Sequence, residues 1–331
     1  MLLRTAIGWH FTYEALTKIY STPEGRDSFL AVIFPPPPAP LKGAEPPFSA
    51  EGYLRASTGP LAPYFRSLVP DVDSLDKLDL AKLKQRWQQD LDRYARHYQF
   101  DNAQRQEAEK ILAAREAEAE AWFRDPEHIE KIQEYKDDLA HVDRVLADPK
   151  SLAFERERAY HERKELDATR RELAGVVDGW TKNLHDAWSK LGGRGELAPV
   201  APPPPLWTQM DWINVVTMYG MLAVGVLLLL GLLTPAAALG AAAYLTLFYL
   251  SMPPWPHIPP SPQSEGHYLF VNKNLIELLA CLVLASTPNG LWVGLDALLF
   301  GRWARRRRQR AEEAEAMAVS EGPPEQAAAR T

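Results

Sequence analysis

The chain has 331 residues, of which 37 are Lys or Arg and 43 are Asp or Glu, giving a formal net charge of −6 at pH 7. This balance gives no support to nucleic-acid binding, and the single cysteine excludes an intramolecular disulfide and a Cys-x-x-Cys redox pair. Residues 71–199 carry 29 acidic and 23 basic side chains, whereas residues 207–300 are almost uncharged. The composition therefore predicts a membrane protein with one large polar insertion.

Residues 2–20, LLRTAIGWHFTYEALTKIY, are helical in propensity but are interrupted by His10, Glu14 and Lys18. His10, Glu14 and Lys18 are spaced by four and therefore share one helical face. Two interpretations stay open: an amphipathic helix at the membrane interface, or a first span whose ionisable face points into a bundle. No cleavable signal peptide is expected, because the segment lacks a proper apolar core and a small-residue cleavage site.

Residues 21–70 contain no long periodic segment. The run FPPPPAPL at 34–41 predicts a stiff polyproline strut. Two short amphipathic pieces follow, at 49–56 and 60–68, separated by Gly59-Pro60. They are too short to cross a bilayer, so we expect them to lie in the plane of the lipid head groups.

From residue 74 to 191 the apolar residues fall into steps of three and four, which is typical of helices packed in coiled-coil fashion. Pro126 and Pro149 stand where new helices would begin. The sequence predicts three helices, at 75–124, 127–148 and 150–191, with the first packing along the other two. A structural role is favoured for these seams, a partner-docking surface being the alternative, and the histidines are expected to face solvent. The seams consist of Leu80, Leu83, Trp87, Leu91, Tyr94 and Tyr98; of Ile132, Tyr135, Leu139, Val142 and Leu146; and of Leu166, Leu173, Val177, Trp180, Leu184, Trp188 and Leu191.

A second proline strut, VAPPPPLW at 200–207, leads into the longest apolar stretch of the chain. Residues 212–250 contain no Asp, Glu, Lys, Arg or His, so their backbone can be satisfied in lipid only by helices. Residues 212–233 would rise about 33 Å, enough for one span. Thr234-Pro235 interrupts the run, and a second span at about 236–252 completes a transmembrane hairpin.

The C-terminal third begins with a proline-rich loop at 251–268 that cannot be helical. Residues 269–286 then predict a mostly apolar helix with a polar beginning, and 290–303 an interfacial helix or a kinked continuation of it. The residues beyond 311 lack periodicity and are predicted to be disordered. The polar residues of the apolar helix are Asn272, Lys273, Asn274 and Glu277.

The arginine-rich segment at 302–310 predicts the topology, because short segments rich in Lys and Arg stay on the cytoplasmic side. Counting the spans backwards from this segment places the loop at 251–268 and the insertion outside the cytoplasm. The N- and C-termini then lie inside if residues 2–20 form a span. The basic residues of the insertion do not oppose this, because long domains are translocated regardless of charge.

Several phrases of the sequence resemble the DoxX family of small four-helix membrane proteins. They are AIGWHFTYEALTKIY, FSAEGYLRASTGPLAPYFR, GLLTPAAALGAAAYLTLFYL, VNKNLIELLACLVLA and the Gly-Leu-Asp at 294–296. The resemblance covers residues 1–70 and 207–300, not the helical insertion. It implies an all-α protein, a four-helix transmembrane bundle with a large extracytoplasmic insertion between spans 1 and 2, in the inner (cytoplasmic) membrane of bacteria. Similarity to the DoxD subunit of thiosulfate:quinone oxidoreductase implies redox work with quinone as the acceptor.

Under this resemblance the chain divides into residues 1–70 with the first span, the insertion at 71–199, spans 2–4 with the interfacial helix at 200–303, and a cytoplasmic tail at 304–331. The ionisable face of the first span would then meet the last span. We expect a polar pocket there for a quinone head group or a small sulfur anion. Its predicted members are Trp9, His10, Tyr13, Glu14, Lys18, Asn274 and Glu277.

The alternative to a pocket is a buried Glu–Lys pair that only fixes helix packing. Lys18 can neutralise one carboxylate, so either His10 is protonated or one of Glu14 and Glu277 stays neutral. Cys281 lies on an apolar helix and is expected to behave as a small buried hydrophobe rather than as a reactive thiol.

Two classes of function follow. The first is a membrane subunit of a quinone-linked oxidoreductase, and the second is a non-enzymatic anchor or scaffold whose outer coiled coil recruits a partner protein. No nucleotide, flavin, haem or metal motif occurs in the sequence, so the chain alone is not expected to perform a redox half-reaction. The expected partners are membrane lipid and a protein at the insertion, with no nucleic acid, no metal and no covalently bound cofactor.

Overall fold

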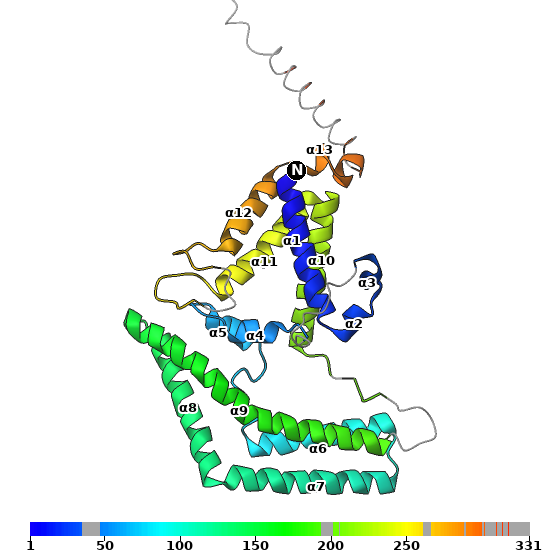
Figure 1. The fold of residues 1–331 in the computed structure, drawn as a ribbon, viewed down its shortest axis with the longest axis vertical. Coiled ribbons are helices and arrows are strands. Elements are labelled where there is room, and N and C mark those ends of the chain that lie inside the picture. The colour runs from blue at the N-terminus through cyan, green and yellow to red at the C-terminus, as the bar shows by residue number, and fades with distance from the viewer. Residues whose placement is uncertain are drawn as a thin grey trace, which may run out of the picture. The chain divides into compact units, whose positions relative to one another are not determined.

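The computed structural model describes residues 1–34, 47–192, 201–204, 206–260, 266–287 and 289–299, with positions 301, 309, 313 and 317. All regular elements in these residues are helices (Figure 1). The chain forms two compact units, each described here by itself. The bundle unit comprises Met1–Phe48, Ile213–Leu250 and Val271–Thr331, and the insertion unit comprises Ser49–Trp212 and Ser251–Phe270.

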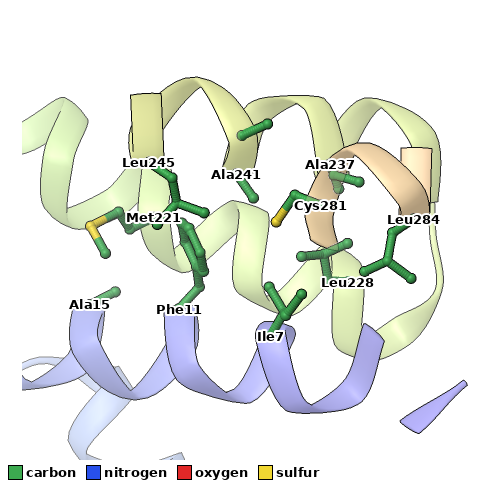
Figure 2. Packing of buried hydrophobic residues seen from close by; sticks show 12 residues of the cluster. Ile7, Phe11, Ala15, Met221, Leu228, Ala237, Ala241, Leu245, Cys281 and Leu284 are labelled. Carbon is green, nitrogen blue, oxygen red and sulfur yellow. The ribbon is translucent and has the colours of Figure 1, made fainter. Parts of the chain in front are cut away.

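Four helices of the bundle unit pack around one apolar core within the described residues (Figure 2). They are α1 (Leu2–Tyr20), α10 (Gln209–Leu230), α11 (Thr234–Ser251) and α12 (Lys273–Ser286); the short helices are α2 (Pro23–Arg26), α3 (Phe29–Ile33) and α13 (Asn289–Trp292). Buried side chains come from all four, including Phe11 of α1, Leu228 of α10, Ala241 of α11 and Leu284 of α12. Cys281 is fully buried among them, as expected of a small hydrophobe.

Helix α1 approaches α10 so closely that small residues are required at the crossing. A Cβ atom added at Gly225 of α10 would lie 2.6 Å from the backbone nitrogen of Thr12 and 2.9 Å from the carbonyl oxygen of Gly8. The Thr12 hydroxyl is satisfied inside α1, where it donates to the Gly8 carbonyl over 2.7 Å. Close approach through glycine and threonine is typical of helices that pack in membranes, where dispersion contacts replace the hydrophobic effect.

The break between α10 and α11 was predicted correctly, but the start of α12 was not. Helix α10 ends at Leu230, and α11 begins at Thr234 with Pro235 in its first turn, where proline is tolerated. Among the described residues, α10 and α11 are long and apolar enough to cross a membrane by length and composition. Helix α12 begins at Lys273 rather than at 269, because the Asn272 side chain caps it by accepting from Leu275 N over 3.0 Å.

The insertion unit contains four long helices in its described part, one more than predicted. They are α6 (Leu80–Tyr98), α7 (Asn102–Arg124), α8 (Pro126–Ala147) and α9 (Ala153–Gly192), preceded by the short helices α4 (Ala50–Arg55) and α5 (Ala62–Ser67). The single helix predicted at 75–124 is wrong. Gln99 takes a left-handed conformation with φ of +52°, and Asp101 and Gln104 then form a capping box that starts α7.

The predicted seams form the core of these four helices. Trp87, Leu184 and Trp188 are buried in a cluster shared by α6, α7 and α9, and a second cluster joins α8 to α9 around Tyr135 and Leu173. Two histidines pack rather than face solvent: the ring of His185 stacks on Tyr94 at 4.9 Å, and that of His128 on Trp122 at 4.2 Å. The insertion thus contains an apolar core of its own.

Several predicted features fall outside the described residues. The strut at 34–41 lies there from residue 35 onward, as do parts of the second strut at 200–207. The arginine-rich segment and the predicted disordered tail lie there almost completely. The loop after α11 is non-helical where it is described, at 253–260 and 266–270, as its prolines predict.

Candidate functional site

The ionisable face of α1 contains an ion pair along the helix. Lys18 Nζ lies 2.8 Å from Glu14 Oε2, one turn earlier. Glutamate N-terminal to lysine at this spacing is the favourable order on a helix. The Lys18 side chain is 22% exposed and that of Glu14 is 43% exposed. This pair therefore lies at the edge of the bundle unit.

One turn before Glu14, His10 connects α1 to α12. His10 Nδ1 lies 2.8 Å from Glu277 Oε1, and Lys273 Nζ lies 3.3 Å from His10 Nε2. Lysine can only donate, so Nε2 acts as the acceptor and Nδ1–H donates to the carboxylate. His10 thus contacts an anion and a cation of α12, one at each ring nitrogen.

Lys273 changes the charge balance that the sequence predicted. Lys18 was expected to be the only cation facing two carboxylates, which would have required a protonated His10 or a neutral acid. Lys273 supplies a second cation, so the cluster pairs two lysines with the two carboxylates of Glu14 and Glu277. We call His10, Glu14, Lys18, Lys273 and Glu277 the polar cluster.

The polar cluster contains buried hydrogen-bonding capacity that the described residues do not use. The Glu277 side chain is 12% exposed, and its Oε2 has no hydrogen-bond partner among the described residues. At the beginning of the same helix, Asn272 is 1% exposed, and its Nδ2 likewise lacks a partner in the described part of the chain. Buried polar groups are normally satisfied, so an acceptor and a donor on α12 that lack partners in the described part of the chain are candidate contacts for a ligand.

The other predicted pocket residues take different positions. Asn274 is buried in the first turn of α12. Trp9 and Tyr13 form an aromatic pair with ring centroids 6.4 Å apart, and about half of each side chain is exposed. The structure therefore unites His10, Glu277 and Lys273, and it places the two aromatic rings on the surface of α1.

A second buried polar centre, absent from the predictions, lies where α10 turns into α11. The Asp296 carboxylate accepts hydrogen bonds from Leu233 N over 2.7 Å and from Thr234 N over 3.0 Å, so it caps α11 from a distant part of the chain. Arg4 is 3% exposed, and its guanidinium packs against Gly231. The Gly-Leu-Asp phrase at 294–296 was the only signal of this centre.

The insertion unit contains an arginine network that the sequence did not reveal. Arg66 Nη2 lies 2.9 Å and Arg163 Nη2 lies 3.0 Å from Asp73 Oδ1, and both arginines also contact Asp143. Burial raises the pKa of Asp73, although Arg66 opposes this by lowering it. The paired charges tie the segment before α6 to α8 and α9, so we interpret the network as structural.

The described residues contain no group of three or more His, Cys, Asp or Glu side chains that could hold a metal ion. No family model, curated protein or solved structure matches the chain. The polar cluster and the helices that carry it are thus the basis for any assignment of function.

Proposed function

We propose that this chain is an integral membrane subunit of a quinone-linked oxidoreductase assembly, and that its polar cluster binds a quinone head group or a small sulfur anion. The observation that carries the proposal is the 2.8 Å hydrogen bond between His10 and Glu277. It joins ionisable side chains of two helices that are otherwise largely apolar. Ionisable residues are expensive in a bilayer, and they usually face a bundle interior and mark a site.

The outer faces of the four helices support a place in lipid. Ile276, Leu279 and Val283 of α12 are 61%, 54% and 56% exposed, although α12 is too short to pass as a span by length and composition. Exposed large apolar side chains stand on the other helices too, such as Val216 of α10 and Leu239 of α11. Large apolar side chains exposed on several helices of one bundle are unfavourable in water and suit hydrocarbon.

The topology follows from the same proposal. With all four helices in the bilayer, the insertion lies outside the cytoplasm and both termini lie inside, as the arginine-rich C-terminal segment predicts. The DoxX-like phrases of the sequence support the bacterial inner membrane as the location.

The polar cluster offers suitable chemistry for a quinone head group. The Lys273 ammonium is a donor that could hold a ring carbonyl, and Glu277 Oε2 is an acceptor for a hydroxyl of the reduced ring. His10 and Glu277 can take up or release a proton at the bound ring. A bound quinone would supply the two-electron redox chemistry that no motif of this chain supplies, and a partner subunit would supply the electrons.

Quinone content of the purified protein tests the proposal. The full chain is purified in mild detergent, co-purifying quinone is quantified by mass spectrometry, and a short-chain quinol, the reduced form that carries ring hydroxyls, is titrated by tryptophan fluorescence. Glu277→Gln should weaken binding by about tenfold or more, because a hydrogen bond to a charged group contributes about 1.5–3 kcal/mol. Glu134→Gln, on the exposed side of α8, is the control and should bind as the wild type does.

Two results would refute the proposal: a folded protein that neither retains nor binds quinone or thiosulfate, or a Glu277→Gln variant with wild-type affinity. The second candidate, a membrane anchor that recruits a partner, is favoured by the separate apolar core of the insertion unit. A stoichiometric soluble partner that co-purifies without quinone would support that function instead.

A further inference from the structure

Helix α3 of the bundle unit exposes an apolar face. Its five residues, FLAVI, are all apolar, and none of them is buried. Phe29 is 73% exposed, Val32 is 76% exposed and Ile33 is 53% exposed. Spacings of three and four place these three side chains on one face of the helix. Solitary exposed apolar residues are normal on proteins, but three on one short helix indicate a surface that contacts something other than water.

The other face of α3 attaches it to the bundle. Its side chains pack on a buried apolar cluster formed by the last turns of α1 and the middle of α10, and Figure 1 shows α2 and α3 beside these helices. The hydroxyl of Tyr20, the last residue of α1, donates to the carbonyl of Phe34 over 2.5 Å. The inward side chains are Leu30, Ala31 and Phe34, and the cluster consists of Leu16, Ile19, Tyr20 and Met218.

Helix α2 holds α3 in this place by reversing the chain directly after α1. A Cβ atom added at Gly25 would lie 1.9 Å from the carbonyl oxygen of Ile19, so only glycine fits against the end of α1. The Gly25 nitrogen donates to the Thr22 hydroxyl over 3.1 Å, which caps α2. Arg26 Nε donates to the Tyr20 carbonyl over 2.6 Å. The position of α3 is therefore fixed by contacts within the bundle unit.

These contacts define the depth of α3 if α1 crosses the membrane as proposed. Helix α1 has 19 residues. It rises about 28 Å, close to the thickness of about 30 Å of a hydrocarbon core. Its last turn then lies in the outer leaflet, the one that faces away from the cytoplasm. Because α3 packs on Leu16 and Ile19, it lies at the same depth.

We propose that α3 inserts Phe29, Val32 and Ile33 into the outer leaflet of the bilayer and anchors there the segment that leaves α1. The inference rests on the proposed membrane location of the bundle unit. Lipid is chosen over a protein partner because the face is small. Three side chains offer roughly 300–500 Å² of surface, whereas a stable protein interface buries about 800 Å² on each partner.

The residues next to α3 define which lipids it should accept. Glu24, Arg26 and Asp27 are exposed in and after α2, and together they have no excess of positive charge. Binding should therefore depend on apolar insertion rather than on anionic head groups. Bilayers of phosphatidylcholine alone should suffice.

Spin-label accessibility in the reconstituted full chain tests the inference. Val32→Cys is labelled with a nitroxide in phosphatidylcholine nanodiscs; Cys281 is fully buried and is not expected to react. The label at 32 should collide more with oxygen than with a water-soluble nickel chelate, as lipid-exposed sites do. The matched control is Glu24→Cys, on the exposed polar side of the neighbouring helix α2, where the ratio of oxygen to nickel collisions should be lower.

A label at Leu239, on the exposed face of α11, separates failure of this inference from failure of the proposed function. Lipid-like collisions at 239 with water-like collisions at 32 would refute only the insertion of α3. Water-like collisions at both sites would refute the membrane location as well. A label at 32 that is protected from both reagents would show that protein covers α3, and it would overturn the lipid assignment.

Discussion

The crossing of α1 and α10 gives the most direct test of the bundle, because Gly225 of α10 stands directly against the backbone of α1. Replacement of Gly225 by alanine would place a methyl group 2.6 Å from Thr12 N and 2.9 Å from Gly8 O. Ordinary contact begins at 3.4 Å, so the two helices would have to separate by roughly 0.8 Å. The opposing atoms belong to the backbone of α1 and cannot turn away, so no change of rotamer relieves the clash.

The magnitude follows from two opposing terms. Overpacking of this kind costs about 1–3 kcal/mol, and a rigid backbone neighbour favours the upper end. Alanine recovers about 1 kcal/mol over glycine through helix propensity. We therefore expect Gly225→Ala to destabilise the bundle by roughly 2 kcal/mol.

Gly240→Ala in α11 is the matched control. Its added Cβ would meet only a methyl group of Val224, at 3.2 Å, and that side chain can shift. This variant should be as stable as the wild type or slightly more stable. Cys281 is the single cysteine and is fully buried in the bundle core, so its maleimide reactivity during an SDS titration reports opening of this unit. Equal SDS midpoints for the two variants would show that α1 does not pack on α10 in this way.

Three further predictions concern the insertion. A reporter cysteine at Gln133 should react with a membrane-impermeant maleimide in whole cells, and labelling only after lysis would reverse the topology. A soluble fragment of residues 71–192 should be highly helical by circular dichroism with a cooperative melt, and Trp188→Ala should destabilise it by about 3–5 kcal/mol, because Trp188 is completely buried. A featureless spectrum of the unmodified fragment would show that the helices need the rest of the chain. Burial raises the pKa of Asp73 in the folded state. This group therefore stabilises the folded state most at pH values below its ordinary pKa, and that contribution is lost as pH rises through the raised pKa. Asp73→Asn should therefore gain stability relative to the wild type as pH rises above about 4 in urea unfolding; a constant difference would contradict the shift.

Most of the individual helices could be predicted from the sequence. Residues 2–20 form α1 as predicted, and the interruption at Thr234-Pro235 separates α10 from α11. Apolar residues in steps of three and four identified the buried seams of the insertion. These features depend on composition and periodicity within one segment, and such information is present in every short window of the chain.

One local feature was missed although its signal was present. The apolar steps continue from Tyr98 through Leu112 and suggested an uninterrupted helix, but Asp101 and Gln104 have the residue types and spacing of a capping box. Helix propensity and periodicity do not reveal that a chain reverses direction. The capping box marks the start of a new helix, and Gln99, in its left-handed conformation, ends the helix before it.

The place of Lys273 in the polar cluster and the cap of α11 were decided only by the tertiary structure. His10 and Lys273 are 263 residues apart, and Asp296 caps a helix that begins 62 residues earlier. Neither pairing has a signature in its own segment, because a lysine or an aspartate next to an apolar run is equally compatible with a solvated position. Helix packing excludes water from these groups, and a buried charge or backbone N–H is stable only beside a partner. The packing of the helices therefore determines which residues pair.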